Sequence, residues 1–407
     1  MSCNSPVAPA ARIPRATCKL FGAIKALSTI RNSVILVHGP KGCVYHINYI
    51  LGMRGDRPSE IYTTGLSERD VIFGAEQKLK DAVAYLDDAL RPELLFVLSC
   101  CSSDIIGEDV GSAVRDVKTR AKTIAIAAGG FEGDFHEGYS ETLCQLVREF
   151  AGKPGRTDAR AVNLVGMLRA GPDLMELRRI LGLIGVTVNA VLTADTSRGE
   201  LERLGDAALN IVPCEPSGKE AAVLLEKLCG TPYIIEEIPI GYLSTTGFLL
   251  RVAKTLGIET PALPEGPGAA PDCSFLKNRR IAIVSGPTRA VSMVRFLKEY
   301  DIAPRLIVVD SGSSVEEKIR NLAGSDSEVL IEPGYERIVE GLREHKINLL
   351  IGGMLELPLA KTLGIDHIDI MHGSERTIGF AGAENLARIL KKKSGIPGET
   401  GQKDFCR

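Results

Sequence analysis

The sequence predicts an α/β protein built from three successive doubly wound, Rossmann-like domains with parallel sheets. Short runs of Val, Ile and Leu alternate with segments of helical periodicity along the whole chain. This alternation is typical of parallel strands that are buried on both faces and joined by crossover helices. Two stretches rich in Pro and Gly interrupt it, at 152–160 and 260–273. The 42 glycines and the low aromatic content of 5% fit the tight strand-to-helix turns of such sheets.

The strands are expected where the apolar runs lie, and most intervening segments are long enough for one helix. In chain order the strands are predicted near 33–38, 93–99, 123–128, 161–166, 187–192, 208–213, 233–238, 280–285, 305–310, 328–332, 347–351 and 367–371. The two interruptions mark the domain boundaries. We therefore expect an N-terminal α/β domain over 1–155, a middle α/β domain over 156–265, and a C-terminal α/β domain over 266–407 that ends in a polar tail.

Composition excludes several classes of partner. The 49 Lys and Arg residues nearly balance 51 Asp and Glu residues, so no basic surface for nucleic acid or anionic lipid is expected. No apolar run is long enough to span a membrane, and the N-terminus lacks the apolar stretch of a signal peptide. We therefore expect a cytoplasmic protein. No GxGxxG motif follows an expected strand into a helix, and no GxxxxGK(S/T) motif occurs. Any nucleotide chemistry would therefore come from another protein.

Ten cysteines in a cytoplasmic chain indicate metal ligation or catalysis more than disulfides. Cys43 and Cys101 directly follow apolar runs, and Cys18 precedes a helical pattern. Each lies at an expected helix N-terminus, where the dipole favours the thiolate that iron requires. Three thiolates are one short of a four-cysteine site, so another residue or a second subunit would complete the coordination.

Buried structural cysteines and a zinc site are the alternatives. Free cysteine is among the most buried residue types, but inert cysteines are expected inside strands, whereas these three lie at turns. Structural zinc sites typically use close CxxC-type pairs, and these cysteines are far apart in the sequence. We therefore predict an iron–sulfur cluster at Cys18, Cys43 and Cys101. Cys100 must point elsewhere and is expected in a supporting or core role.

Motifs along nearly the whole chain resemble the nitrogenase component 1 family. That family includes the catalytic α and β chains, the scaffold pair that matures the iron–molybdenum cofactor, and the subunits of dark-operative protochlorophyllide reductase. The motifs are Cys18, HGPKGC (38–43), TTGLSERDVIFGAEQKL (63–79), SCCSSDIIGEDV (99–110), GFEGDFHEGY (130–139), VNLVGM (162–167), GVTVNAVLTADTS (185–197), NIVPCEPSG (210–218), RIAIVSGPTRAVSMVRFLKE (280–299), LAKTLGID (359–366) and GFAGAENLARIL (379–390).

The resemblance implies cofactors and partners. Cys18, Cys43 and Cys101 match the cysteines with which each family subunit holds a cluster, 4Fe–4S or larger, at a subunit interface. Cys214 resembles the α-chain cysteine that binds the terminal iron of the large active-site cofactor, which implies a second iron–sulfur cofactor. A second component 1-type subunit, identical or paralogous, and an ATP-dependent iron–sulfur reductase protein are implied as partners. Ile378 replaces the cofactor histidine of the catalytic α chain, which argues against dinitrogen reduction.

Other polar residues are weaker candidates. His38 is expected to order the cluster loop, and His372 either approaches the cleft or bonds to nearby backbone. The 130–139 loop is either a proton relay or a solvated loop, through Glu132, Asp134, His136 and Glu137. Glu108 and Asp109 are expected to complement a helix dipole.

Three roles fit these observations. The leading one is an oxidoreductase subunit that accepts electrons from the ATP-dependent protein and passes them to a substrate or second metal centre in the cleft between domains. The alternatives are a scaffold on which a nitrogenase-type cofactor matures, and a subunit of a tetrapyrrole reductase. The sequence leaves the substrate, the cluster nuclearity and the identity of the partner subunit open.

Overall fold

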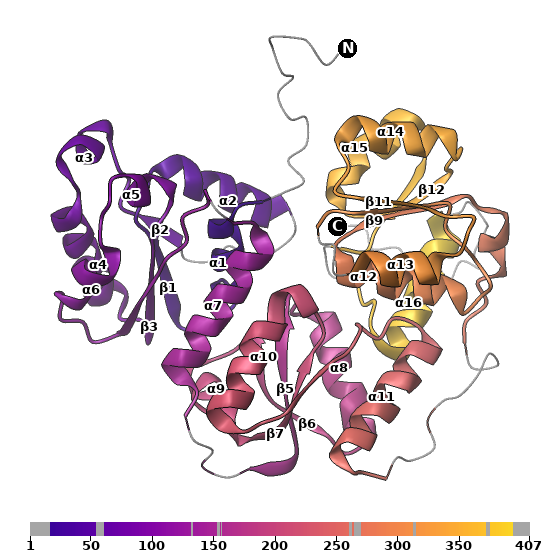
Figure 1. The fold of residues 1–407 in the computed structure, drawn as a ribbon, viewed down its shortest axis with the longest axis horizontal. Helices are drawn as coiled ribbons and strands as arrows, with labels where there is room; N and C mark the ends of the chain where they lie inside the picture. Colours follow the sequence, from indigo (N-terminus) through magenta and orange to yellow (C-terminus); the bar gives the residue numbers. More distant parts are fainter. Residues whose placement is uncertain are drawn as a thin grey trace, which may run out of the picture.

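The chain folds into three parallel β-sheets that follow one another along the sequence (Figure 1). The computed structural model describes residues 17–53, 61–131, 133–152, 155, 157–259, 263, 270–311, 315–371 and 375–393. Every run that the sequence predicts as a strand overlaps a strand, and helices lie on both sides of the sheets. The predicted α/β fold of three successive doubly wound sheets is therefore confirmed.

The first sheet has the strand order β2-β1-β3-β4. These strands are β1 (Ser33–Val37), β2 (Ile61–Thr63), β3 (Leu94–Leu98) and β4 (Lys122–Ile126). The helices are α1 (Lys19–Leu27), α2 (Lys41–Met53), α3 (Glu68–Phe73), α4 (Glu76–Leu90), α5 (Cys101–Ile105), α6 (Val110–Arg115) and α7 (Phe135–Phe150). Ile35 and Phe96 pack with α1 and α7, whereas Leu36 and Leu95 pack with α4 and α6. Both faces are thus buried, as the continuous apolar runs predicted.

The middle sheet has the strand order β6-β5-β7-β8. Its strands are β5 (Asp158–Met167), β6 (Thr187–Thr193), β7 (Ala207–Val212) and β8 (Tyr233–Ile235). The accompanying helices are α8 (Pro172–Leu183), α9 (Arg198–Glu202), the 3-10 turn η1 (Leu204–Asp206), α10 (Glu215–Cys229) and α11 (Tyr242–Leu256). Helix α7 packs against both α1 and α10 and so joins the first unit to the middle one.

The third sheet has the strand order β11-β10-β9-β12-β13. Its strands are β9 (Ile281–Ser285), β10 (Leu306–Val309), β11 (Glu328–Ile331), β12 (Leu349–Gly352) and β13 (Asp366–Asp369). The helical segments are η2 (Ser274–Asn278), α12 (Pro287–Lys298), α13 (Glu316–Ala323), α14 (Tyr335–Glu344), η4 (Met354–Glu356), α15 (Leu357–Leu363) and α16 (Gly379–Lys393). The last helix, α16, returns to pack against α8 and α11 of the middle unit.

The middle sheet shares its two faces with the two flanking units. Val162 and Leu164 belong to a core cluster that continues into the third unit, whereas Val165 and Val212 belong to one that continues into the first. The strands lie within the three predicted ranges, and the limits at 155 and 265 stay predictions. No helix in the described part of the chain is long and apolar enough to cross a membrane.

Candidate functional site

The three predicted ligand cysteines all lie at helix starts. Cys18 is the N-cap of α1, Cys43 lies in the first turn of α2, and Cys101 is the first residue of α5. The helices whose first turns carry Cys43 and Cys101, α2 and α5, follow the adjacent parallel strands β1 and β3, so both cysteines lie at the carboxyl edge of the first sheet. All three are free thiols; Cys18 is exposed and the other two are half-buried.

Gly130, in the loop after β4, brings Cys18 and Cys101 together. Its N–H donates to Cys101 Sγ at 3.2 Å. A Cβ atom at this position would lie 3.0 Å from Cys18 Cβ and 3.5 Å from Cys101 Sγ. A side chain at Gly130 would therefore crowd Cys18 and touch Cys101. We call Cys18, Cys43, Cys101 and Gly130 the thiol rim.

The electrostatics of Cys43 show that the thiols interact. Burial raises the pKa of Cys43 most, and the neighbouring thiols Cys100, Cys101 and Cys18 raise the pKa further because several thiolates repel one another. This result differs from the expectation that a helix start favours the thiolate at this position. Burial and the neighbouring thiols therefore favour the neutral thiol of Cys43 in the metal-free chain, whereas iron, as a cation, would favour its thiolate.

The spacing of the thiols bears on the kind of metal group. Among the described residues, no three Cys, His, Asp or Glu side chains converge so as to hold a single metal ion. Iron–sulfur clusters take cysteine thiolates on different iron atoms. The donor set on the thiol rim, three cysteine sulfurs from separate helix starts, fits such a cluster.

A buried hydrogen-bond network supports the rim. His38 has no exposed surface, its Nδ1 lies 3.0 Å from Thr64 Oγ1, and its Nε2 bonds the Glu108 carboxylate. Glu108 also accepts the N–H of Ala75, which precedes α4. The Cys100 thiol points inward and bonds the carbonyl of His38 at 3.3 Å. His38 thus orders the loop before Cys43, in line with the sequence hypothesis.

A second candidate region is a cavity of about 1200 Å³ that all three units line. The first unit contributes 28–31 and 134–136, the middle unit 166–172 and Cys214, and the third unit 284–289. Several of these segments follow the carboxyl ends of parallel strands, where ligands bind in doubly wound folds. The cavity is therefore the inter-domain cleft that the sequence predicted.

Cys214 lies in the wall of this cavity. It follows β7, is the N-cap of α10, and is 2% exposed. The Thr288 hydroxyl donates to its Sγ at 3.2 Å, and Ser217 Oγ lies 3.4 Å from the sulfur. Burial raises the pKa of the Cys214 thiol. His136 Nδ1 lies 3.0 Å from the same Ser217 hydroxyl, and burial lowers the pKa of its imidazole, so His136 faces the cavity region as a neutral base.

The other polar residues of the 130–139 loop have a local role. Asp134 is the N-cap of α7 and forms a reciprocal capping box with Glu137. Asp109 similarly caps α6 through the N–H of Ser112. Glu132 and His372 lie outside the described residues. Asp134 and Glu137 therefore serve the start of α7, whereas His136 bonds Ser217 at the cavity wall.

Sequence reasoning missed a buried ion-pair group beside the cavity. Asp173 is fully buried and lies 3.2 Å from both Arg169 and Arg289. It also accepts the N–H of Thr377 at 2.7 Å and that of Ile378 at 3.2 Å. Ile378 itself packs in the core at 1% exposure. The sequence places Arg169 four residues before Asp173, but nothing in it marks the approach of Arg289 and Thr377, which come from distant parts of the chain.

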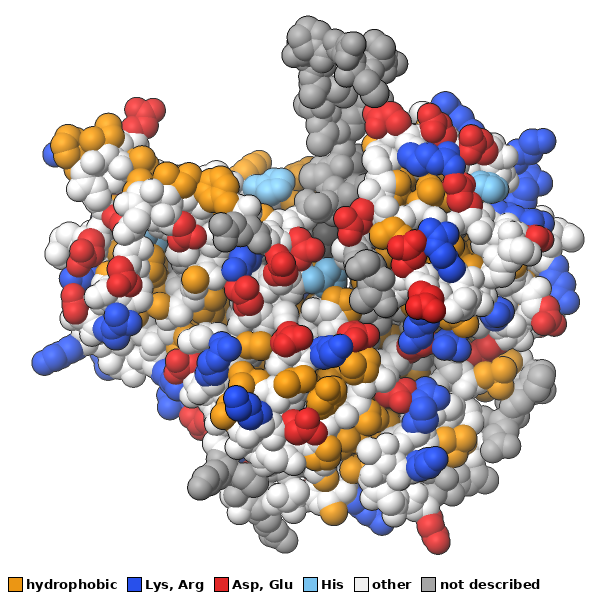
Figure 2. Space-filling model, in the orientation of Figure 1, with side chains coloured by type: hydrophobic (Ala, Val, Ile, Leu, Met, Phe, Trp, Pro, Cys, Tyr) orange, Lys and Arg blue, Asp and Glu red, His pale blue; other side chains and the backbone are white. Residues whose placement is uncertain are grey.

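Exposed apolar side chains gather on the first unit. Val71, Ile72 and Phe73, at the end of α3, are 44%, 73% and 78% exposed. Tyr45 and Tyr49, on the α2 helix that carries Cys43, are also exposed. Figure 2 shows hydrophobic side chains gathered over this side of the molecule. Such groups mark contact surfaces for other proteins.

Comparisons with known proteins agree on one family. The model of the family described as nitrogenase component 1 type oxidoreductase matches residues 18–393. The chain is 28% identical to nitrogenase iron-molybdenum cofactor biosynthesis protein NifE of Clostridium pasteurianum, over 93% of this chain and 87% of that protein. It is 27% identical to a light-independent protochlorophyllide reductase subunit of Methylobacterium radiotolerans, over 85% of this chain and 68% of that protein.

A solved structure shares the fold. The structure titled "Nitrogenase Cp1 at pH 6.5" superposes with a TM-score of 0.85 at 19% identity, covering 96% of this chain and 94% of that one. At this identity the likeness supports the fold alone.

Proposed function

The chain belongs to the nitrogenase component 1 type oxidoreductase family, and we propose that it is the iron–sulfur subunit of a nitrogenase-like two-component reductase. The observation that carries the proposal is the thiol rim, where Cys18, Cys43 and Cys101 stand at three neighbouring helix starts and Gly130 lies against Cys18 and Cys101. These cysteines would hold a 4Fe–4S or larger cluster, which supplies one-electron chemistry when bound. A cytoplasmic location is part of the proposal.

The protein's own contribution at the rim is positioning and charge stabilisation. The Gly130 N–H donates to Cys101 Sγ and so stabilises negative charge on that sulfur. His38 and Glu108 fix the loop that leads to Cys43. Sulfur hydrogen bonds and solvent exposure are the usual means by which proteins set cluster potentials.

We propose two protein partners, which the exposed surfaces would accommodate. Three thiols leave a cluster under-ligated and Cys18 is exposed, so a second component 1-type subunit, identical or paralogous, would complete and cover the site. That subunit would contact α2, where Tyr45 and Tyr49 are exposed next to Cys43. The ATP-dependent iron–sulfur reductase protein would dock on the apolar tip of α3 at 71–73.

The cavity would hold the acceptor of the electrons, either a substrate or a second iron–sulfur cofactor bound at Cys214. Thr288 and Ser217 place hydroxyl groups beside the sulfur, and these hydrogen bonds offset part of the burial that raises the pKa of Cys214. His136 reaches the same wall through Ser217 and could exchange protons with the cavity.

A scaffold for cofactor maturation is the second candidate. Ile378 packs in the core, so the chain offers no ligand at the position of the family's cofactor histidine. One ligand in place of two suits a cofactor that is held and then released. The likeness to the cofactor biosynthesis protein supports the same reading. A scaffold would transfer its cofactor to an acceptor protein without consuming electrons, whereas a reductase would keep it through turnover.

The test is the iron and sulfide content of protein purified without oxygen. Cys18→Ala, Cys43→Ala and Cys101→Ala should each lose most of the iron, because each removes one thiolate of the rim. Cys144→Ala is the matched control, since Cys144 lies on α7 and packs against the core. Full iron retention in all three rim variants would refute the assignment. A cavity without metal in the wild-type protein would favour an organic substrate such as a tetrapyrrole.

A further inference from the structure

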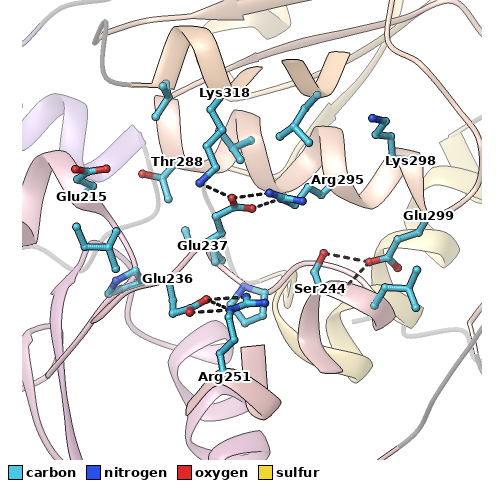
Figure 3. A pocket seen from close by; sticks show the side chains of 18 of the residues that line it. Glu215, Glu236, Glu237, Ser244, Arg251, Thr288, Arg295, Lys298, Glu299 and Lys318 are labelled. Atoms are coloured by element: carbon cyan, nitrogen blue, oxygen red, sulfur yellow. Dashed lines mark hydrogen bonds and ion pairs between the residues drawn. The ribbon is translucent and has the colours of Figure 1, made fainter. Parts of the chain in front are cut away.

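A second pocket of about 660 Å³ lies between the middle and third units, outside the Cys214 cavity. It is bounded by the start of α11 and by α12 and α13. Leu243, Val291 and Leu322 contribute apolar walls, and ion pairs cross its interior (Figure 3). We call it the outer pocket.

The two cavities share part of their walls. Pro213, Ile238 and Thr288 line both the outer pocket and the Cys214 cavity. Thr288 also donates the hydrogen bond to Cys214 Sγ. Thr288 therefore stands between Cys214 and the outer pocket, and Ile238 belongs to the same dividing wall.

Ile238 belongs to residues 236–240, the strap that joins β8 to α11. Glu236 pairs with Arg251 of α11 within the middle unit, at 2.7 Å. Glu237 instead pairs across the pocket with Arg295 of α12 and Lys318 of α13, both in the third unit (Figure 3). Burial alone would raise the pKa of Glu237, but hydrogen bonds from Arg295 and Lys318 hold it below the ordinary value. Glu237 is thus ionised and clamps the 236–238 part of the strap to the third unit, whereas the carbonyl of Pro239 accepts the N–H of Gly379 at 2.8 Å and fixes the other end.

We propose that the strap is a gate between the outer pocket and the Cys214 cavity, held closed by the ion pairs of Glu237 with Arg295 and Lys318. When these pairs break, Ile238 moves away from Thr288 and the two cavities join into one passage to Cys214. The gate would serve loading or release of whatever the cavity holds. The gate rests on the proposed function and deepens it. Its opening is measured as access of a reagent to Cys214, so it can be tested on the metal-free chain.

The test is the rate at which fluorescein-5-maleimide, a bulky thiol reagent, labels Cys214 in the full-length metal-free chain. Peptide mass spectrometry distinguishes labelling at Cys214 from labelling at the other cysteines. Glu237→Gln should raise the Cys214 rate about tenfold, because the clamp to the third unit is lost while size and shape are kept. Glu236→Gln is the matched control; it breaks a pair within one unit and should leave the rate within about twofold.

A blocking variant shows whether the reagent reaches Cys214 through the outer pocket or directly through the Cys214 cavity. Leu243 lines the outer pocket alone and is 52% exposed, so Leu243→Trp can fill this pocket without disturbing the core. Added to Glu237→Gln, it should return labelling to the wild-type rate. Lys318→Gln removes one of the two ion pairs of Glu237 and should raise the labelling rate of Cys214 by less than Glu237→Gln does. It replaces Glu237→Gln in the test if that variant does not fold.

Several results would overturn the gate. Equal rates in wild type, Glu237→Gln and Lys318→Gln would do so, as would fast labelling that Leu243→Trp does not slow. A parallel increase at Cys144, Cys229 and Cys273 would indicate general loosening instead of a gate. These outcomes are independent of the proposed function, whose failure would appear as absent iron at the thiol rim with the labelling pattern unchanged.

Discussion

Replacing Gly130 by Ala tests the thiol rim with a single methyl group. A Cβ at this position lies 3.0 Å from Cys18 Cβ, closer than ordinary van der Waals contact, and 3.5 Å from Cys101 Sγ. Cys18 is exposed and can move, so the cost to folding should be small, about 1 kcal/mol, at the low end for overpacking. The movement, however, displaces one ligand relative to another. Gly130→Ala should therefore lose a large part of its iron while its fold is kept.

Gly42→Ala is the matched control for this prediction. Gly42 adjoins Cys43 in α2, and among the described residues nothing beyond its own helix backbone and chain neighbours lies within 4 Å of the place that an added methyl group would take. An alanine there should leave iron binding unchanged and stabilise α2 by about 0.5–1 kcal/mol through helix propensity. The assays are iron per chain after oxygen-free purification and urea unfolding of the metal-free forms. Equal iron in the two variants would refute the inferred closeness of Cys18 and Cys101.

Three further changes probe the other parts of the molecule. Phe73→Asp should abolish ATP-dependent reduction by the partner protein and keep all the iron, because the side chain is 78% exposed; unchanged reduction would remove α3 from the docking surface. Asp173→Asn should cost about 3–5 kcal/mol in urea unfolding, since it leaves Arg169 and Arg289 without their buried carboxylate. Burial alone would raise the pKa of Asp173, but these arginines hold it below the ordinary value, so wild-type stability from this group is present above about pH 4 and is lost as the pH falls further; a variant with the same acid sensitivity as wild type would contradict this. Cys214→Ala should remove a second iron population and spare the rim; loss of all iron together would place both populations at one site.

The sequence predicted most of the fold because long apolar runs specify buried parallel strands. It missed β2, since Ile61–Thr63 is a three-residue edge strand, only partly buried, without such a run. It also predicted that Cys18, Cys43 and Cys101 lie at helix starts, because a cysteine directly after an apolar run or before a helical pattern occupies a turn.

The supporting contacts could not be predicted in the same way. Gly130 lies in a loop whose sequence shows no reason to approach Cys18, and Glu108 was expected only to complement a helix dipole. Its bond to buried His38 depends on the packing of loops that follow β1 and β3. The raised pKa of Cys43 likewise arises from thiols distant in sequence. Local patterns specify elements, whereas charges and close contacts between elements need the assembled fold.

The most direct test of the proposed function combines iron and sulfide analysis with mass in solution, on wild-type protein purified without oxygen. Cys18, Cys43 and Cys101 supply three thiolates and Cys18 is exposed, so the cluster needs ligation and cover from a neighbour. We predict iron and sulfide together in an assembly of at least two component 1-type subunits. A stable monomer that carries a complete cluster, or a protein with no iron at all, would contradict the proposed function.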